Sequence, residues 1–183
     1  KSRPLLKAPE IVGQPVPELL NLLKSYETTT REFARRELQQ RGREEVIPLL
    51  EKWVEELDPS EAEHEHHLTE ALWMHQNLNS FGVDLLKRQL SSNDSGARIA
   101  ATQVLRFWQG EIDGSLDLIR QQIDDSDMRV RLQAVLASSF SKSEKALETA
   151  LEAANYELDL GLEHALNETL RYLEELENHD GHQ

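Results

Sequence analysis

The chain has 183 residues, of which 38% are hydrophobic and 5% aromatic, a length that allows one domain with a sizeable core. Its 20 basic and 34 acidic side chains give a formal net charge of −14 at pH 7, which argues against nucleic acid and anionic membrane surfaces as partners because both attract Lys and Arg. The absence of cysteine excludes disulfides, thiolate metal sites and covalent haem attachment within this chain.

The chain is predicted to begin with an extended lead-in or linker at residues 1–16, because residues 1–17 carry four of the six prolines. Five helix pairs follow in a helical domain at residues 17–177, and residues 178–183 are expected to be a disordered tail. No apolar run reaches 18 residues, so a soluble protein with no membrane-spanning segment is expected. The predicted pairs are 17–25 with 29–41, 44–57 with 60–78, 83–90 with 96–108, 116–123 with 128–139, and 143–153 with 159–177.

Short polar side chains mark the expected helix starts. Thr28, Thr29 and Thr30 offer cap oxygens to the second helix, which is expected to end at Gly42. Ser60 and Glu63 have the spacing of a capping box for the fourth helix.

A hydrophobic residue that closes one helix returns every 33 or 34 residues along the chain. Residues 84–105 and 117–138 also match one another at an offset of 33. A fixed period in this range indicates units that must stack to bury their apolar faces. The sequence therefore predicts an all-α protein, an α-α superhelix of about five helix pairs. The recurring positions are Leu23, Leu57, Leu90, Ile123 and Tyr156.

An Asp-to-Arg signature recurs in the third and fourth pairs. Asp94 and Asp127 fall at helix starts, where a carboxylate favours the positive end of the macrodipole. Arg98 and Arg131 follow four residues later, and a ladder of acids and guanidinium groups between repeats is expected from them. With small residues at the helix contacts, this pattern resembles the HEAT repeat family. Tetratricopeptide and armadillo repeats are alternatives, although neither the tetratricopeptide signature nor a third helix per unit is evident.

The densest group of titratable side chains lies at residues 61–76. Its members His64, His66, His67 and His75 are weak candidates for metal ligands, because helical spacing brings some of them close to glutamates. The His-Glu-x-x-His pattern is absent, and a solvated, charged helix is the main alternative. No catalytic or cofactor-binding residue is predicted, since neither a nucleophile elbow nor a Gly-rich phosphate loop occurs.

Aromatic residues suggest one further surface. Trp73 and Trp108 fall late in second helices, on the side that lines the concave face of many solenoids. Together with His75 they form a candidate interaction surface if exposed, and core packing is the alternative.

Several phrases, in order along nearly the whole chain, resemble the HEAT-repeat region of large exported proteins of planctomycetes and related bacteria, described as membrane-bound dehydrogenase-like or haem-binding. They are VPELLNLLKS (16–25), EHHLTEALWMHQNLN (65–79), DLLKRQLSSNDSGARIAATQVLRFW (84–108), DMRVRLQAVLASSF (127–140) and LNETLRYLEEL (166–176). In that family the helical array lies between a β-propeller and a cytochrome c domain.

The resemblance implies a non-catalytic scaffold, the middle domain of an exported, periplasmic redox protein, with haem c in a separate domain of the parent. Its partner would be a flanking domain of the same polypeptide or a docking protein, and the chain is expected to be a monomer. Two alternatives stay open at this stage. One is a free-standing acidic adaptor that binds a basic protein, and the other is a metal-binding protein that uses the His-rich helix.

Overall fold

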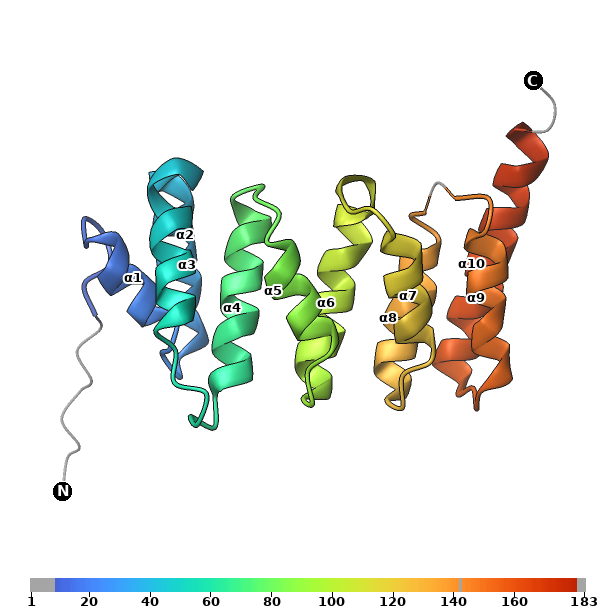
Figure 1. Cartoon of the computed structure of the whole chain (residues 1–183), viewed down its shortest axis with the longest axis horizontal. Coiled ribbons are helices and arrows are strands. Elements are labelled where there is room, and N and C mark those ends of the chain that lie inside the picture. Colours follow the sequence, from blue (N-terminus) through green and yellow to red (C-terminus); the bar gives the residue numbers. More distant parts are fainter. Residues whose placement is uncertain (1–8, 142, 181–183) are drawn as a thin grey trace. The chain divides into compact units, whose positions relative to one another are not determined.

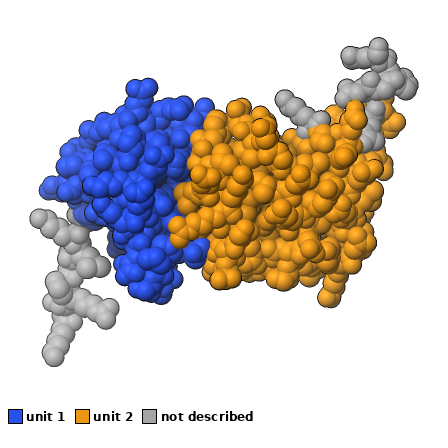
Figure 2. All heavy atoms as spheres, viewed as in Figure 1, with its two compact units in different colours: residues 1–80 blue, residues 81–183 orange. Residues whose placement is uncertain are grey.

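The computed structural model describes residues 9–141 and 143–180, and over these residues the protein is all-α. Ten α-helices and two short 3-10 helices, Gln109–Glu111 and Glu152–Asn155, make up the described chain, without a strand. The backbone divides into two compact units, residues 1–80 and 81–183 (Figure 2).

Unit 1 holds four helices: α1 (Val16–Leu22), α2 (Thr28–Arg41), α3 (Arg43–Glu55) and α4 (His64–Asn77) (Figure 1). Helix α1 packs against α2 and α3, and α4 packs against the same two helices. Their apolar faces meet in one core, because amphipathic helices are stable only when these faces are buried together. The fully buried large side chains of this core are Leu19, Leu20, Leu23, Leu38, Leu50, Leu68, Leu72 and Met74.

Unit 2 holds six helices: α5 (Val83–Leu90), α6 (Ser95–Trp108), α7 (Ser115–Ile123), α8 (Met128–Ser138), α9 (Ala146–Leu151) and α10 (Leu160–Asp180). Helix α8 lies between α6 and α10, and α7 contacts α9, so alternate helices are neighbours in two layers (Figure 1). Ala101 and Ala134 are fully buried, and their small side chains allow α6 and α8 to approach closely. Leu86, Leu105, Ile119 and Ile123 fill the space between the layers.

The same turn recurs where the first helix of a pair passes into the second. A side-chain oxygen accepts a hydrogen bond from the backbone N–H two residues further on, at 2.7 to 3.2 Å. Short polar side chains favour this geometry because they can replace a backbone acceptor. The residues are Ser25, Asp58, Ser92 and Asp125, spaced by 33 or 34 positions. The period therefore fixes the turns as well as the apolar positions.

The observed helix bounds lie close to the predicted ones, with two corrections at helix starts. Helix α4 begins at His64, four residues after Ser60, so the prediction of a capping box at Ser60 and Glu63 is wrong. Both the amide and the hydroxyl of Ser60 donate to Asp58 Oδ1, at 2.8 and 2.7 Å, which uses the serine in the preceding turn. Helix α2 has Glu27 as its N-cap without a side-chain capping bond, and Thr28 lies inside the helix.

The end of α2 matches the prediction. Gly42 has φ of +85° and ψ of 163°, a conformation essentially restricted to glycine, and it separates α2 from α3.

The predicted tail and lead-in are only partly covered by the structure. Helix α10 continues to Asp180, so residues 178–180 are helical where a disordered tail was expected. Residues 181–183, and residues 1–8 of the predicted lead-in, lie outside the described residues. The all-α fold class is confirmed, whereas the HEAT superhelix over residues 17–177 stays a prediction.

Candidate functional site

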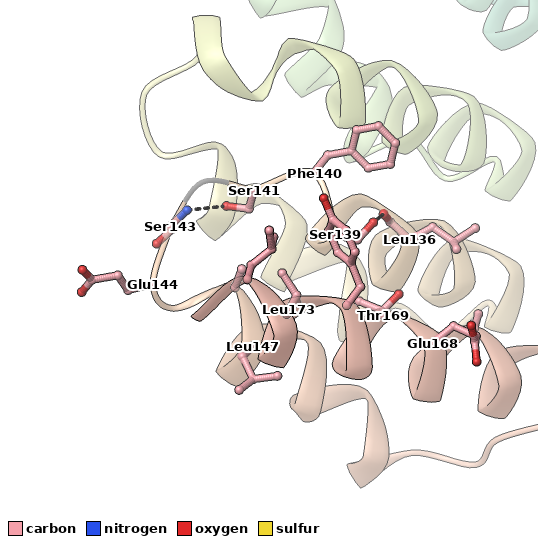
Figure 3. Close-up of a pocket in the computed structure, with 14 residues that line it drawn as sticks. Leu136, Ser139, Phe140, Ser141, Ser143, Glu144, Leu147, Glu168, Thr169 and Leu173 are labelled. Atoms are coloured by element: carbon pink, nitrogen blue, oxygen red, sulfur yellow. Dashed lines mark hydrogen bonds between the residues drawn. The ribbon is translucent and has the colours of Figure 1, made fainter. Parts of the chain in front are cut away.

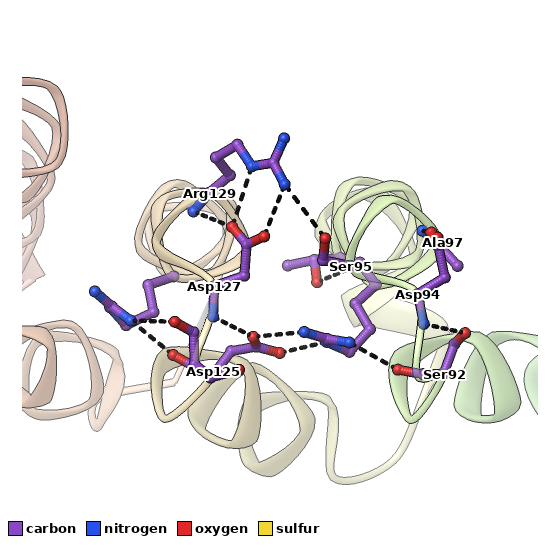
Figure 4. Close-up of polar contacts among 11 residues, drawn as sticks. Ser92, Asp94, Ser95, Ala97, Asp125, Asp127 and Arg129 are labelled. Carbon is purple, nitrogen blue, oxygen red and sulfur yellow. Dashed lines mark hydrogen bonds and ion pairs between the residues drawn. The ribbon is translucent and has the colours of Figure 1, made fainter.

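The most regular polar feature is an arginine that ties a helix to the turn before it (Figure 4). Arg31, Arg98 and Arg131 each donate from Nη1 to the backbone carbonyl six residues earlier, at 2.7, 2.8 and 2.8 Å. These carbonyls belong to Ser25, Ser92 and Asp125, the residues of the recurring turn, so the bond has a structural role. Arg31 makes this bond in the first helix pair, where no Asp-to-Arg signature was predicted.

The predicted ladder of Asp94, Arg98, Asp127 and Arg131 is assembled differently from the expectation. Asp94 Oδ1 accepts from the Ala97 amide and Asp127 Oδ1 from the Arg129 amide, both at 2.8 Å, so these carboxylates cap α6 and α8 as expected. The acid that pairs with Arg98 is instead Asp125, which lies in the turn before α8.

Arg98 and Asp125 form a two-pronged ion pair. Arg98 Nε donates to Asp125 Oδ2 at 2.6 Å and Nη2 donates to Oδ1 at 2.9 Å. The hydrogen bonds that Arg98 donates to Asp125 raise the pKa of the guanidinium despite its partial burial. Only 14% and 9% of the two side chains are exposed, so the pair joins two helix pairs in a poorly solvated place. Arg131 Nη2 makes the next link at 3.2 Å, to the backbone carbonyl of Glu157.

In unit 1 the corresponding acid lies on the His-rich helix. Glu70 of α4 has a fully buried side chain, and it accepts from Arg31 Nε at 3.0 Å and from Arg35 Nη1 at 2.9 Å. Arg35 also stacks over the Trp73 ring, 5.6 Å from its centroid. A buried carboxylate is tolerated only when it is paired and hydrogen-bonded, and here two guanidinium groups from α2 meet that need.

The four candidate histidines lie on α4 but are directed to different partners. His66 Nε2 lies 3.7 Å from Glu70 Oε1, and His67 Nδ1 lies 3.5 Å from Glu61 Oε2. His75 Nδ1 shares a hydrogen bond with Ser80 Oγ at 3.3 Å, and His64 is buried. Within residues 9–141 and 143–180, no three His, Cys, Asp or Glu side chains form a group that could hold a metal ion.

Burial determines the titration of two of these histidines. It lowers the pKa of His67, with the charge of Lys24 acting in the same direction and Glu61 opposing it. It also lowers the pKa of His75, against a smaller opposite effect of Glu51. Both rings therefore favour the neutral form in the folded protein.

The predicted interaction surface of Trp73, His75 and Trp108 needs correction. Trp108 is 3% exposed, because it packs edge-on against Phe81 at 5.4 Å. His75 is 4% exposed, and the half-buried Trp73 is partly covered by Arg35. Core packing, the alternative considered from the sequence, describes Trp108 and His75.

Unit 2 instead presents an apolar cleft of about 1190 Å³ that the sequence did not indicate (Figure 3). Apolar side chains from α8, α9, α10 and the segment after α8 line it, and Glu144 and Glu168 lie among them. Phe140, Tyr172 and Leu176 are 52%, 48% and 42% exposed. The apolar lining side chains are Leu136, Phe140, Ala146, Leu147, Ala165, Tyr172, Leu173 and Leu176.

An aromatic cluster extends this apolar surface. Phe140 meets Phe107 edge-on at 5.9 Å, and Phe107 is 57% exposed. The Arg106 guanidinium lies 4.7 Å from the Phe107 ring centroid and 5.2 Å from that of Phe140, within cation–π distance of both rings. A contiguous exposed apolar patch of this kind is typical of an interaction site. The cleft and this cluster form the candidate binding site.

No protein-family model matches the sequence, and comparison with curated proteins finds no significant match. Over residues 9–141 and 143–180, no helix combines the length and hydropathy needed to cross a membrane. The resemblance to exported haem-binding proteins therefore remains an expectation from the quoted phrases.

Proposed function

We propose that this chain is a non-catalytic scaffold of stacked helix pairs, of the HEAT type, that binds protein. The observation that carries the proposal is the apolar cleft of unit 2 with its three half-exposed large side chains, Phe140, Tyr172 and Leu176. Leaving such side chains in water forfeits about 25 cal/mol for each Å² of apolar area that a partner could cover. The recurring arginines, by contrast, each tie a helix to the turn that precedes it and have a structural role.

Site-specific photo-crosslinking on the whole chain tests this function. A benzophenone side chain is placed at Tyr26 or Phe33 in unit 1 and at Tyr172 in unit 2, all at least 48% exposed, and irradiated in the source cells. We expect adducts with a defined protein or with a flanking domain of the parent polypeptide. If no position in either unit gives an adduct, the proposal fails.

The context we propose for the scaffold is the middle part of a larger exported dehydrogenase-like and cytochrome c-like redox protein, located in the periplasm. The support is the ordered series of phrases from residues 16–176. The chain has no cysteine, so any covalently attached haem c would belong to another domain. The encoding reading frame is expected to continue into a segment with a Cys-x-x-Cys-His site. A frame without such a segment would remove this context and leave the scaffold function intact.

The main alternative is a free-standing adaptor for a basic protein, which is favoured by the net charge of −14. Its binding would weaken steeply with salt because the attraction is largely electrostatic. The metal-binding alternative receives less support, since the histidines of α4 are directed to different partners. Elemental analysis of protein purified without a histidine tag or nickel column is expected to show no stoichiometric metal.

A further inference from the structure

The cleft of unit 2 has the form of a groove for one helix. On α10, Ala165, Thr169, Tyr172 and Leu176 succeed one another at steps of three or four residues, which places them along one helix face. Leu136 of α8, Phe140, Ala146 and Leu147 of α9, and Leu173 of α10 supply the rest of the apolar lining. Figure 3 shows labelled side chains from these segments around the opening.

The size of the cleft also suits a helix. Small-molecule pockets commonly measure roughly 300–1000 Å³ and enclose most of the ligand. A helix about 10 Å across would fill 1190 Å³ over roughly 15 Å, on the order of ten residues. Such an occupant would cover the exposed parts of Phe140, Tyr172 and Leu176 with an apolar stripe of its own.

The charge around the groove selects the kind of helix. Residues 136–180, which include every lining residue, carry eleven Asp and Glu against three Lys and Arg. Glu144 and Glu168 line the cleft itself; Glu168 is paired with Arg171, and the Arg106 guanidinium lies over Phe140 at one edge. A partner with acidic flanks would meet like charge, whereas Lys and Arg beside its apolar stripe would meet complementary charge. An anionic membrane surface would be repelled by the same acidic side chains.

We propose that the cleft between α8, α9 and α10 binds a basic amphipathic helix of a partner protein. Leu and similar side chains of that helix pack on Tyr172, Leu176 and Phe140, and its Lys and Arg side chains face Glu144 and compete with Arg171 for Glu168. This inference rests on the proposed protein-binding function and adds to it the place of binding and the chemistry of the partner.

Two designed 18-residue helical peptides test the proposal by fluorescence anisotropy with the full chain. Both carry Leu at positions i, i+3, i+4 and i+7, and they differ only in flanks of Lys or of Glu. The Lys peptide is expected to bind at least tenfold more tightly than the Glu peptide. Equal binding of both, or no binding of the Lys peptide, would overturn the proposal. Preferential binding to vesicles of phosphatidylcholine would also overturn it, because the patch would then be a lipid surface.

Matched variants locate the binding. Tyr172→Glu is expected to weaken binding of the Lys peptide at least tenfold, as is common for a central aromatic anchor. Tyr26→Glu is the control, because Tyr26 is 99% exposed and lies in unit 1. The double variant Glu144→Lys with Glu168→Lys is expected to reverse the preference toward the Glu peptide. Circular dichroism of each variant verifies that it is folded, and Tyr172→Ala replaces Tyr172→Glu if the latter unfolds. Insensitivity of binding to the Tyr172 variant would refute the assignment to this cleft.

The crosslinking experiment separates this inference from the general function. Adducts from Tyr26 or Phe33 without any from Tyr172 would leave the scaffold function standing and overturn the cleft as its binding site. Adducts from none of the positions would overturn both.

Discussion

Replacing Arg98 by alanine removes a two-pronged, largely buried ion pair from unit 2. The guanidinium makes two hydrogen bonds with Asp125 and one with the Ser92 carbonyl, and only 14% of its side chain is exposed. Removing one partner of a buried ion pair costs about 3–5 kcal/mol, because the other charge is left without its counterion. Asp125 still accepts a hydrogen bond from the Asp127 amide at 2.7 Å, which stabilises the remaining carboxylate. We therefore expect Arg98→Ala to lower the free energy of unfolding of unit 2 by about 3 kcal/mol, the lower end of that range.

The neighbouring pair of Arg129 and Asp127 provides the matched control. Its N–O distance is 2.8 Å, but 70% of the Arg129 side chain is exposed, so water screens the attraction. Urea unfolding by circular dichroism measures the total change, and hydrogen exchange of peptides from α6 and α8 assigns it to unit 2. Arg129→Ala is expected to lower the free energy of unfolding much less than Arg98→Ala does. Equal losses of stability in the two arginine variants would contradict this reasoning. So would a double-mutant cycle in which the losses caused by Arg98→Ala and Asp125→Ala simply add, because interacting partners are not additive.

Three further predictions concern unit 1. Glu70→Gln keeps the shape of the buried side chain but removes its charge, and it is expected to cost about 3 kcal/mol or more in urea unfolding; an unchanged midpoint would show that the two arginines do not depend on the carboxylate. Gly42→Ala is expected to cost about 1–3 kcal/mol because of its φ of +85°, whereas Gly110→Ala, which has open space and no positive φ, is expected to have little effect. Since burial lowers the pKa of His75, the unfolded chain takes up a proton first as the pH falls below 6.5. The free energy of unfolding therefore declines on acidification below pH 6.5. His75→Gln is expected to flatten this decline between pH 7 and 5, and an unchanged slope would contradict this reasoning.

The histidine cluster shows why a dense group of ligand-type residues in sequence need not form a site. Helical spacing placed several of the side chains on neighbouring turns of α4, as expected. Their directions depend on what packs against each face: Glu70 lies beside His66, Glu61 beside His67, and Ser80 beside His75. Burial of His75 and Trp108 likewise depended on neighbours contributed by other segments, such as Phe81 against Trp108. Spacing along one helix contains no information about those neighbours.

The sequence by itself determined the all-α class, the approximate helix bounds and the caps formed by Asp94 and Asp127, because these depend on local periodicity, turn chemistry and the free amides of a helix start. Only the tertiary structure decided that Arg98 pairs with Asp125. The capping carboxylates are engaged with backbone amides near their own helix starts, and helix packing brings a turn 27 residues away into reach. The cleft has the same origin: Phe140 and Tyr172 are separated by 32 positions, and they line one surface only because α10 packs against α8. An apolar stripe in a sequence predicts burial, and the tertiary structure decides which part of it is left for a partner.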